Sequence, residues 1–216
     1  HRLLDSFEAR LPKPWIQMGH SMGGCLSLLA LAKGEKRFAA SALSAPMLGV
    51  IASGYMLYLA RALVFLSRTF RLSGRYLFED AGNPFELTFE KDRIAHDRAR
   101  WDRYQAQLKA EPRLAIGNLT WGWLDFALKA TLFLQTSEAV RDIHIPVLIV
   151  AAGDDDRVIT ADTARVAAKL PDRTYLEIPD AWHEILMETD DIRAVWWDAF
   201  DTLVARVCEP ASKRIE

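Results

Sequence analysis

A serine in a glycine-rich segment is the first candidate for chemistry in this chain. Gly19-His20-Ser21-Met22-Gly23 fits the pattern G-x-S-x-G, which places a serine on a sharp turn between a strand and a helix. Side chains at Gly19 and Gly23 would collide with neighbouring backbone, which explains both glycines. The N-terminus of the following helix would favour negative charge near Ser21. We therefore predict that Ser21 is a nucleophile and that the Met22 backbone N–H is one donor of an oxyanion hole.

A serine hydroxyl is a poor nucleophile unless a base takes its proton, and the chain offers five histidines. His183 follows a predicted strand and precedes a predicted helix. This position lies beyond the carboxyl end of a strand, where open α/β sheets collect their functional groups. His144, between two isoleucines, is better explained as a structural histidine. We expect His20 to pack beside the serine turn and His183 to be the base.

Three consecutive aspartates offer the acid that must orient such a histidine and stabilise its charged form. Asp154, Asp155 and Asp156 all follow a buried-type strand predicted at 145–151. At most one of them can point at the histidine, and the others are expected to be solvated or to cap the turn. Side-chain chemistry alone leaves the choice among the three open.

The elements expected around these residues alternate between strand and helix. Apolar segments predict strands at 15–18, 38–44, 145–151 and 174–178, and helices at 25–33, 160–170 and 191–207. Such alternation is typical of a parallel sheet. Together with the chain order serine, aspartate, histidine, it predicts an α/β-hydrolase fold with an inserted helical cap. We expect hydrolase core at 1–48 and 141–216, and the cap at 49–140.

The predicted cap contains a helix that is apolar over an unusually wide surface, from Gly49 to Ser73. On a helix, Arg61, Arg68 and Arg71 would form one narrow polar stripe. A surface helix needs only one apolar face, so a second could line an acyl groove or touch a lipid surface. Burial of both faces by other cap helices is the alternative. The charged segment 92–109 is predicted to be a solvated helix face.

Several segments together resemble the monoacylglycerol lipase and bacterial lysophospholipase family of serine α/β-hydrolases. They are residues 19–24, 43–47, 83–88, 120–124, 152–158 and 182–188. In that family the acid precedes an arginine and an apolar residue, as Asp156 precedes Arg157 and Val158. The resemblance therefore implies a catalytic triad of Ser21, Asp156 and His183.

The resemblance also implies cleavage of a carboxylic ester of a single-acyl-chain glycerolipid, a lysophospholipid or a monoacylglycerol, through an acyl-enzyme. Family members carry early strands and a second oxyanion donor before the serine turn, so we expect this sequence to be a fragment. Fold and triad do not fix a substrate. Another esterase, thioesterase or peptidase of this fold, or a non-catalytic lipid-binding relative, remains the alternative.

The amino-acid composition limits which other partners and structural features the protein can have. The 27 basic and 29 acidic residues nearly balance, which argues against nucleic-acid binding, and no metal or organic cofactor is expected. Cys25 and Cys208 do not make a disulfide framework. An uncharged run at 38–60 is interrupted by Pro46, Gly49 and Gly54, which argues against a membrane span. We expect a cytoplasmic or peripheral membrane protein whose cap contacts the membrane and whose partner is a small lipid ester.

Overall fold

The computed structural model describes residues 2–50, 55–78 and 82–208 of the chain. Its strands are β1 (Trp15–His20), β2 (Phe38–Ser44), β3 (Val147–Ala152) and β4 (Arg173–Ile178). They form one sheet in the order β1-β2-β3-β4, and every neighbouring pair is parallel. The predicted parallel sheet is confirmed.

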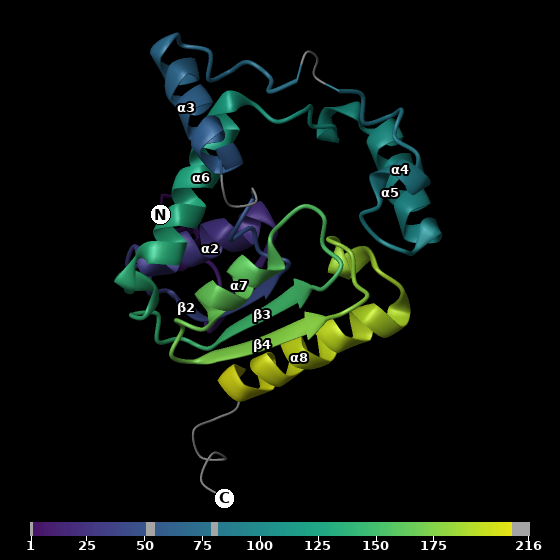
Figure 1. Ribbon diagram of the computed structural model, residues 1–216. Coiled ribbons are helices and arrows are strands. Elements are labelled where there is room, and N and C mark those ends of the chain that lie inside the picture. The colour runs from purple at the N-terminus through teal and green to yellow at the C-terminus, as the bar shows by residue number, and fades with distance from the viewer. Residues whose placement is uncertain (1, 51–54, 79–81, 209–216) are drawn as a thin grey trace, which may run out of the picture.

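Helices cover both faces of this sheet (Figure 1). One face carries α2 (Met22–Ala32), α6 (Trp121–Thr136) and α7 (Thr160–Ala167), with Leu28 and Ile149 in its core. The other face carries α8 (Asp190–Cys208), whose Trp196 packs with Leu148 and Val150. All six residues of β3 are buried, as expected for a parallel strand covered on both faces.

The carboxyl ends of parallel strands meet at one edge, and this edge gathers the candidate residues. β1 ends at His20, directly before Ser21. β3 ends at Ala152, before the three aspartates, and β4 ends at Ile178, before the loop that contains His183. The sheet therefore brings together three segments that lie far apart in the sequence.

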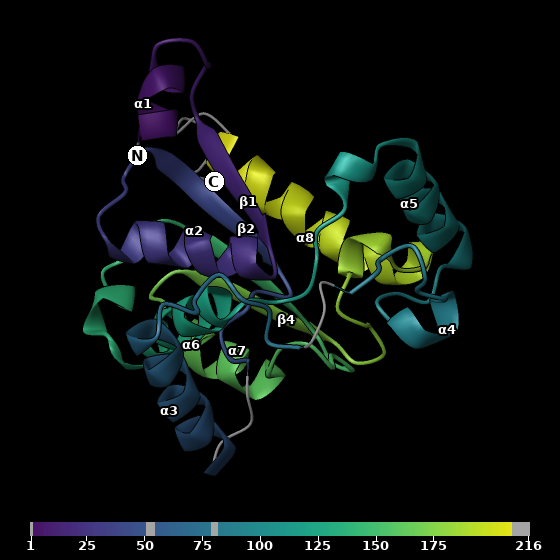
Figure 2. The same cartoon turned by 90° about the horizontal axis from the view of Figure 1, so that it is seen from above.

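The segment between β2 and β3 is helical, as predicted. It contains α3 (Tyr55–Thr69), α4 (Phe89–Asp92), α5 (Arg98–Ala110) and α6, with short 3₁₀ turns at Pro112–Leu114 and Glu138–Val140. Two arms rise from the core: α3 leans on α6, whereas α4 and α5 stand beside the start of α8 (Figures 1 and 2). Val64 of α3 packs against Leu124 and Leu128 of α6.

One expectation about the cap is wrong. Helix α3 ends at Thr69, and Arg71 follows with a φ of 58°, so Arg71 does not continue a stripe with Arg61 and Arg68. Within the segment 92–109, most side chains of α5 are exposed, as expected for a solvated helix face, whereas Trp101 and Leu108 on its other side are buried. The sequence pattern did not reveal this buried face because charged residues surround it.

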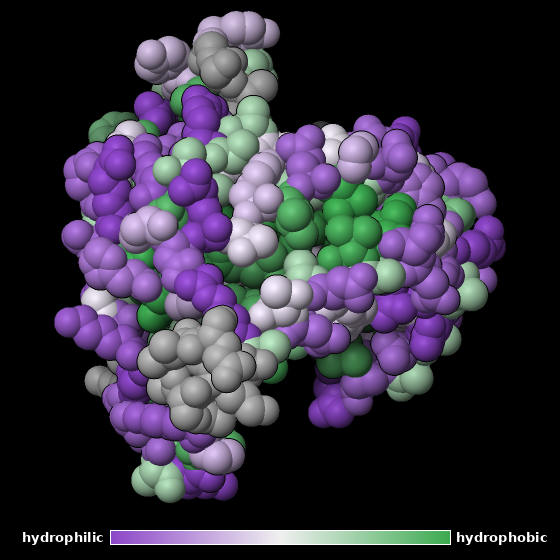
Figure 3. Space-filling view, turned by 90° about the horizontal axis from the view of Figure 1, so that it is seen from below, coloured by the Kyte–Doolittle hydropathy of each residue, from purple (hydrophilic) through white to green (hydrophobic). Residues whose placement is uncertain are grey.

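The remaining elements are short, and the side of the core that carries α8 has an apolar surface area. Helix α1 (Arg2–Glu8) precedes β1, and a 3₁₀ turn (Ile185–Met187) precedes α8. On the α8 side, apolar side chains gather in one area with hydrophilic ones around it (Figure 3). A groove of about 430 Å³ lies there between β4 and α8, with Leu176 and Val195 in its lining. None of the helices in the described ranges has the length and hydropathy needed to cross a bilayer.

Candidate active site

Ser21 lies on a strained turn between β1 and α2. Its φ of 50° and ψ of −119° fall in a region that non-glycine residues rarely adopt. Neighbouring backbone holds it there: its N–H donates to the Ser44 carbonyl at 3.0 Å, and its carbonyl accepts from the N–H of Met47 at 2.9 Å. The turn predicted from G-x-S-x-G is therefore confirmed, and the chain after β2 fixes it.

The glycines of this turn have different roles. A Cβ on Gly19 would lie 2.7 Å from the Gly23 carbonyl oxygen, so the predicted collision is confirmed there. The same prediction is wrong for Gly23, because a Cβ at that position would meet no atom within 4 Å in the described part of the chain. The second close approach belongs to Gly24, whose Cβ would lie 2.6 Å from that of Pro46.

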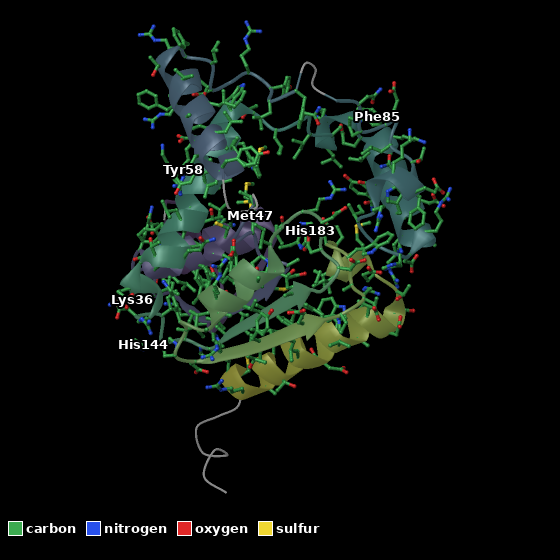
Figure 4. The ribbon with its side chains drawn as sticks, viewed as in Figure 1. Lys36, Met47, Tyr58, Phe85, His144 and His183 are labelled. Carbon is green, nitrogen blue, oxygen red and sulfur yellow. The ribbon has the colours of Figure 1, made fainter. Side chains whose placement is uncertain are left out.

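His183 bridges the serine and a carboxylate. Its Nε2 lies 2.9 Å from the Ser21 Oγ, and its Nδ1 lies 2.7 Å from Oδ2 of Asp155. The carboxylate can only accept, so we assign the ring proton to Nδ1, which leaves Nε2 free to accept the serine proton. The His183 side chain is 8% exposed and that of Asp155 is fully buried, so both interactions are shielded from water. Figure 4 places His183 at the edge of the core below the cap, and His144 at the opposite end of the sheet.

The expectation that Asp156 is the partner of His183 is wrong. The Asp156 side chain is 55% exposed and pairs with the Arg157 Nε at 3.0 Å. Asp155 instead accepts the backbone N–H groups of Arg157 and Val158 on Oδ1, at 2.8 and 3.0 Å, which turns its Oδ2 toward His183. The fold of this short loop therefore selects Asp155.

A second histidine–carboxylate pair adjoins the first. His20 packs beside the turn as expected: its ring centre lies 4.9 Å from that of His183, and its Nε2 lies 3.0 Å from Oε1 of Glu184. Burial raises the pKa of the Glu184 carboxyl, but the hydrogen bond from His20 and the electrostatic influence of the His20 and His183 rings bring that pKa below its ordinary value. An ionised carboxylate thus stands beside the candidate base. Sequence reasoning missed this pair, although Glu184 lies within the segment 182–188 that carried the family resemblance.

A buried glutamate ties the histidine loop to the cap. Glu188 is fully buried and accepts the backbone N–H groups of His96 and Trp182, each at 2.9 Å, as well as the His96 ring nitrogen Nδ1 at 2.8 Å. The ring centres of His96 and Trp182 lie 3.8 Å apart. On the acid loop, Arg157 donates to the Asp92 carbonyl at 2.5 Å. The segment before α5 therefore holds both loops that carry the partners of Ser21.

The cap also touches the start of α2. Met22 is the first residue of α2, so its N–H has no acceptor within the helix, which keeps the predicted oxyanion role available. Its sulfur accepts a hydrogen bond from the Trp123 indole of α6 at 3.2 Å. In the described ranges, no group of three or more His, Cys, Asp or Glu side chains could hold a metal ion. Cys25 and Cys208 are free, and burial raises the pKa of the Cys25 thiol to about 12.

The parallel sheet, the serine turn and the Ser21–His183–Asp155 contacts define an α/β-hydrolase. Residues 3–190 match the serine aminopeptidase S33 family, and the chain belongs to this family of serine hydrolases.

Its relatives include a lysophospholipase, and its fold is that of monoglyceride lipases. The chain is 28% identical over 214 residues to lysophospholipase L2 of Escherichia coli, a match that covers 94% of this chain and 62% of that protein. A soluble variant of monoglyceride lipase from Saccharomyces cerevisiae has a TM-score of 0.69 at 19% identity, covering 95% of this chain and 68% of that one. Monoacylglycerol lipase from Paleococcus ferrophilus has a TM-score of 0.64 at 16% identity, covering 94% and 73%. The predicted fold and family are confirmed, and the chain spans less than two thirds of the lysophospholipase.

Proposed function

We propose that the complete protein hydrolyses a carboxylic ester of a glycerolipid with one acyl chain, a lysophospholipid or a monoacylglycerol, through an acyl-enzyme. The observation that carries the proposal is the continuous chain of contacts from Ser21 Oγ through His183 to Asp155, at 2.9 and 2.7 Å. A nucleophile, a base and an orienting acid are the three groups that acyl transfer requires.

In the proposed reaction, the Ser21 Oγ attacks the ester carbonyl carbon while His183 Nε2 accepts the hydroxyl proton. The negative charge that develops on the carbonyl oxygen is stabilised by the Met22 N–H and the start of α2. His183 then gives its proton to the departing glycerol oxygen, which leaves the acyl group on Ser21. Water, deprotonated by His183, releases the fatty acid, while Asp155 stabilises the imidazolium in both steps.

Support for a lipid substrate comes from the relatives and from the cap. The Escherichia coli relative is named a lysophospholipase, and two structures of the same fold are named monoglyceride or monoacylglycerol lipases. Apolar side chains are exposed on both cap arms, among them Leu63 on α3 and Phe85 before α4. Figure 4 labels Tyr58 and Phe85 on the two arms, with His183 below them. An apolar cap is suited to an acyl chain rather than to a small polar acid.

Acyl-chain preference tests the substrate class. We expect the complete protein to hydrolyse a decanoyl nitrophenyl ester at least about tenfold faster, by kcat/KM, than the acetyl ester, because each methylene transferred from water contributes about 0.8 kcal/mol. It should also release fatty acid from lysophosphatidylcholine or monooleoylglycerol. A preference for the acetyl ester would favour a different esterase of the same fold.

We also propose that residues 55–78 of the cap contact an anionic membrane surface. Residues 55–78 contain Arg61, Arg68, Arg71 and Arg75, and this range contains no Asp or Glu. Among these arginines, large apolar side chains are exposed, as for Phe65 at 67%. Basic side chains among exposed aromatic ones are typical of interfacial membrane segments. A symmetric contact between two copies of this chain would bring like charges together, which disfavours a second copy as the partner of this surface.

Vesicle binding tests the membrane contact. Neutralising the four arginines is expected to weaken binding of the complete protein to vesicles of equal phosphatidylcholine and phosphatidylglycerol about 1,000-fold, since each basic residue near an anionic surface contributes about 1 kcal/mol. The control carries the same charge change at exposed positions outside residues 55–78: Lys36→Gln, Lys91→Gln, Arg103→Gln and Lys109→Gln. Equal weakening by both variants would show that net charge, and not this segment, directs binding.

A further inference from the structure

The residues next to Ser21 and His183 in the sequence are themselves joined. His20, the last residue of β1, contacts Glu184 through Nε2 and Oε1 at 3.0 Å. The same two segments already meet at Ser21 and His183, at 2.9 Å. Two polar contacts in adjacent positions therefore hold the serine turn and the histidine loop together.

We propose that His20 and Glu184 form a positioning pair for the base, fixing His183 against Ser21 and stabilising the charged form of His183. This inference rests on the proposed hydrolase function and adds two residues to its machinery. Neither residue needs to touch the substrate, because both act through the His183 ring.

The protonation of the pair follows from its surroundings. Burial raises the pKa of the Glu184 carboxyl, but the hydrogen bond from His20 contributes to bringing that pKa below its ordinary value, so the carboxylate is ionised. His20 Nε2 faces this carboxylate and therefore carries a proton. His20 Nδ1 is buried and has no hydrogen-bond partner among the residues that the structure describes, so an N–H there would be unpaired. The pair then places a negative charge beside the His183 ring.

Glu184 is held at its backbone as well as at its carboxylate. The backbone N–H of Glu184 donates to the Ile94 carbonyl of the cap at 2.9 Å. The titratable groups that face it are His20 from β1, His183 from its own loop, Asp155 from the acid loop and Tyr104 from α5. Asp155 is also negative and contacts His183 directly, so two carboxylates favour the imidazolium. Removing the Glu184 charge should destabilise the imidazolium without removing the orienting bond from Asp155.

The pH dependence of serine labelling tests the charge of the pair. A fluorophosphonate reacts with the activated serine of the complete protein, whatever its natural substrate. In Glu184→Gln, we expect the acid limb of the labelling rate, which is its fall at low pH, to move about one pH unit lower, because protonation of the base is less favourable once a nearby negative charge is lost. The plateau rate should also fall about tenfold, since the imidazolium that forms during reaction is less stable. A purely structural role for Glu184 would lower the rate without moving the limb.

Two substitutions of His20 test positioning. His20→Gln keeps an N–H donor for Glu184, whereas His20→Phe keeps a ring but leaves the carboxylate without that donor. We expect the Gln variant to label about tenfold faster than the Phe variant, with the affinity for the probe unchanged. Thermal unfolding of each variant identifies any that fails to fold, and Glu184→Gln then carries the test alone.

The outcomes separate this inference from the proposed function. An unmoved acid limb in Glu184→Gln overturns the electrostatic role. Equal labelling of folded His20→Gln and His20→Phe overturns the positioning role. Wild-type protein that does not label at Ser21 overturns the proposed hydrolase function, and the inference falls with it.

Discussion

Replacement of Ser21 by alanine is expected to lower hydrolysis of a lysophospholipid or monoacylglycerol by at least about 10⁴-fold in the complete protein. In the proposed mechanism the hydroxyl provides the atom that attacks the ester, and no other side chain contacts Nε2 of His183 among the described residues. The remaining groups could still bind the substrate and polarise its carbonyl, which leaves only a small residual rate. Release of fatty acid under substrate saturation measures the loss in kcat.

Ser27→Ala is the matched control, because Ser27 lies in α2, close to the same turn. This variant should keep a rate within about threefold of the wild type, since ordinary surface substitutions change stability little. Thermal unfolding should show that both variants are folded. Turnover of Ser21→Ala at a rate close to that of Ser27→Ala would remove Ser21 from the mechanism.

Replacement of Asp155 by asparagine is the second large effect, with an expected drop in kcat of about 10⁴-fold. The carboxylate accepts a hydrogen bond from Nδ1 of His183 at 2.7 Å and is fully buried, so in the proposed mechanism it sets the tautomer and stabilises the imidazolium. An amide of the same shape can do neither, because it carries no charge and can present an N–H to the ring.

Asp156→Asn is the comparison that distinguishes the two adjacent aspartates. The Asp156 side chain is 55% exposed and its carboxylate pairs with Arg157, so loss of this carboxylate should change kcat by less than about threefold. Both variants are measured with the same ester over the same pH range. If Asp156→Asn is the more damaging substitution, the acid assigned from the family resemblance is right and the geometry of this loop is misleading.

The serine turn and the order of strands could be predicted from local sequence. Gly19 and Ser21 mark a turn whose close backbone approach only glycine permits, and apolar runs such as Val147–Ala152 mark strands covered on both faces. Because parallel strands end at one edge, the neighbourhood of Ser21 and His183 followed from topology alone. These features depend on short segments and a regular sheet.

The choice of acid and the contacts of the cap could not be predicted in this way. Asp155 and Asp156 differ in direction only because two backbone N–H groups of the same loop bind Oδ1 of Asp155. The bond between His20 and Glu184 joins residues 164 positions apart. The docking of α5 depends on the buried Glu188, whose burial no local pattern signals. Such contacts are decided by tertiary packing rather than by the period of the sequence.

The most direct test of the account is to treat the complete protein with a fluorophosphonate and to locate the covalent adduct by peptide mass spectrometry. We predict one adduct per chain, on Ser21, and its absence from Ser21→Ala. The rate of labelling should fall sharply in Asp155→Asn and remain near the wild-type rate in Asp156→Asn. Folded wild-type protein that acquires no adduct, or that carries it on a residue other than Ser21, would contradict the account and favour a lipid-binding relative without catalysis.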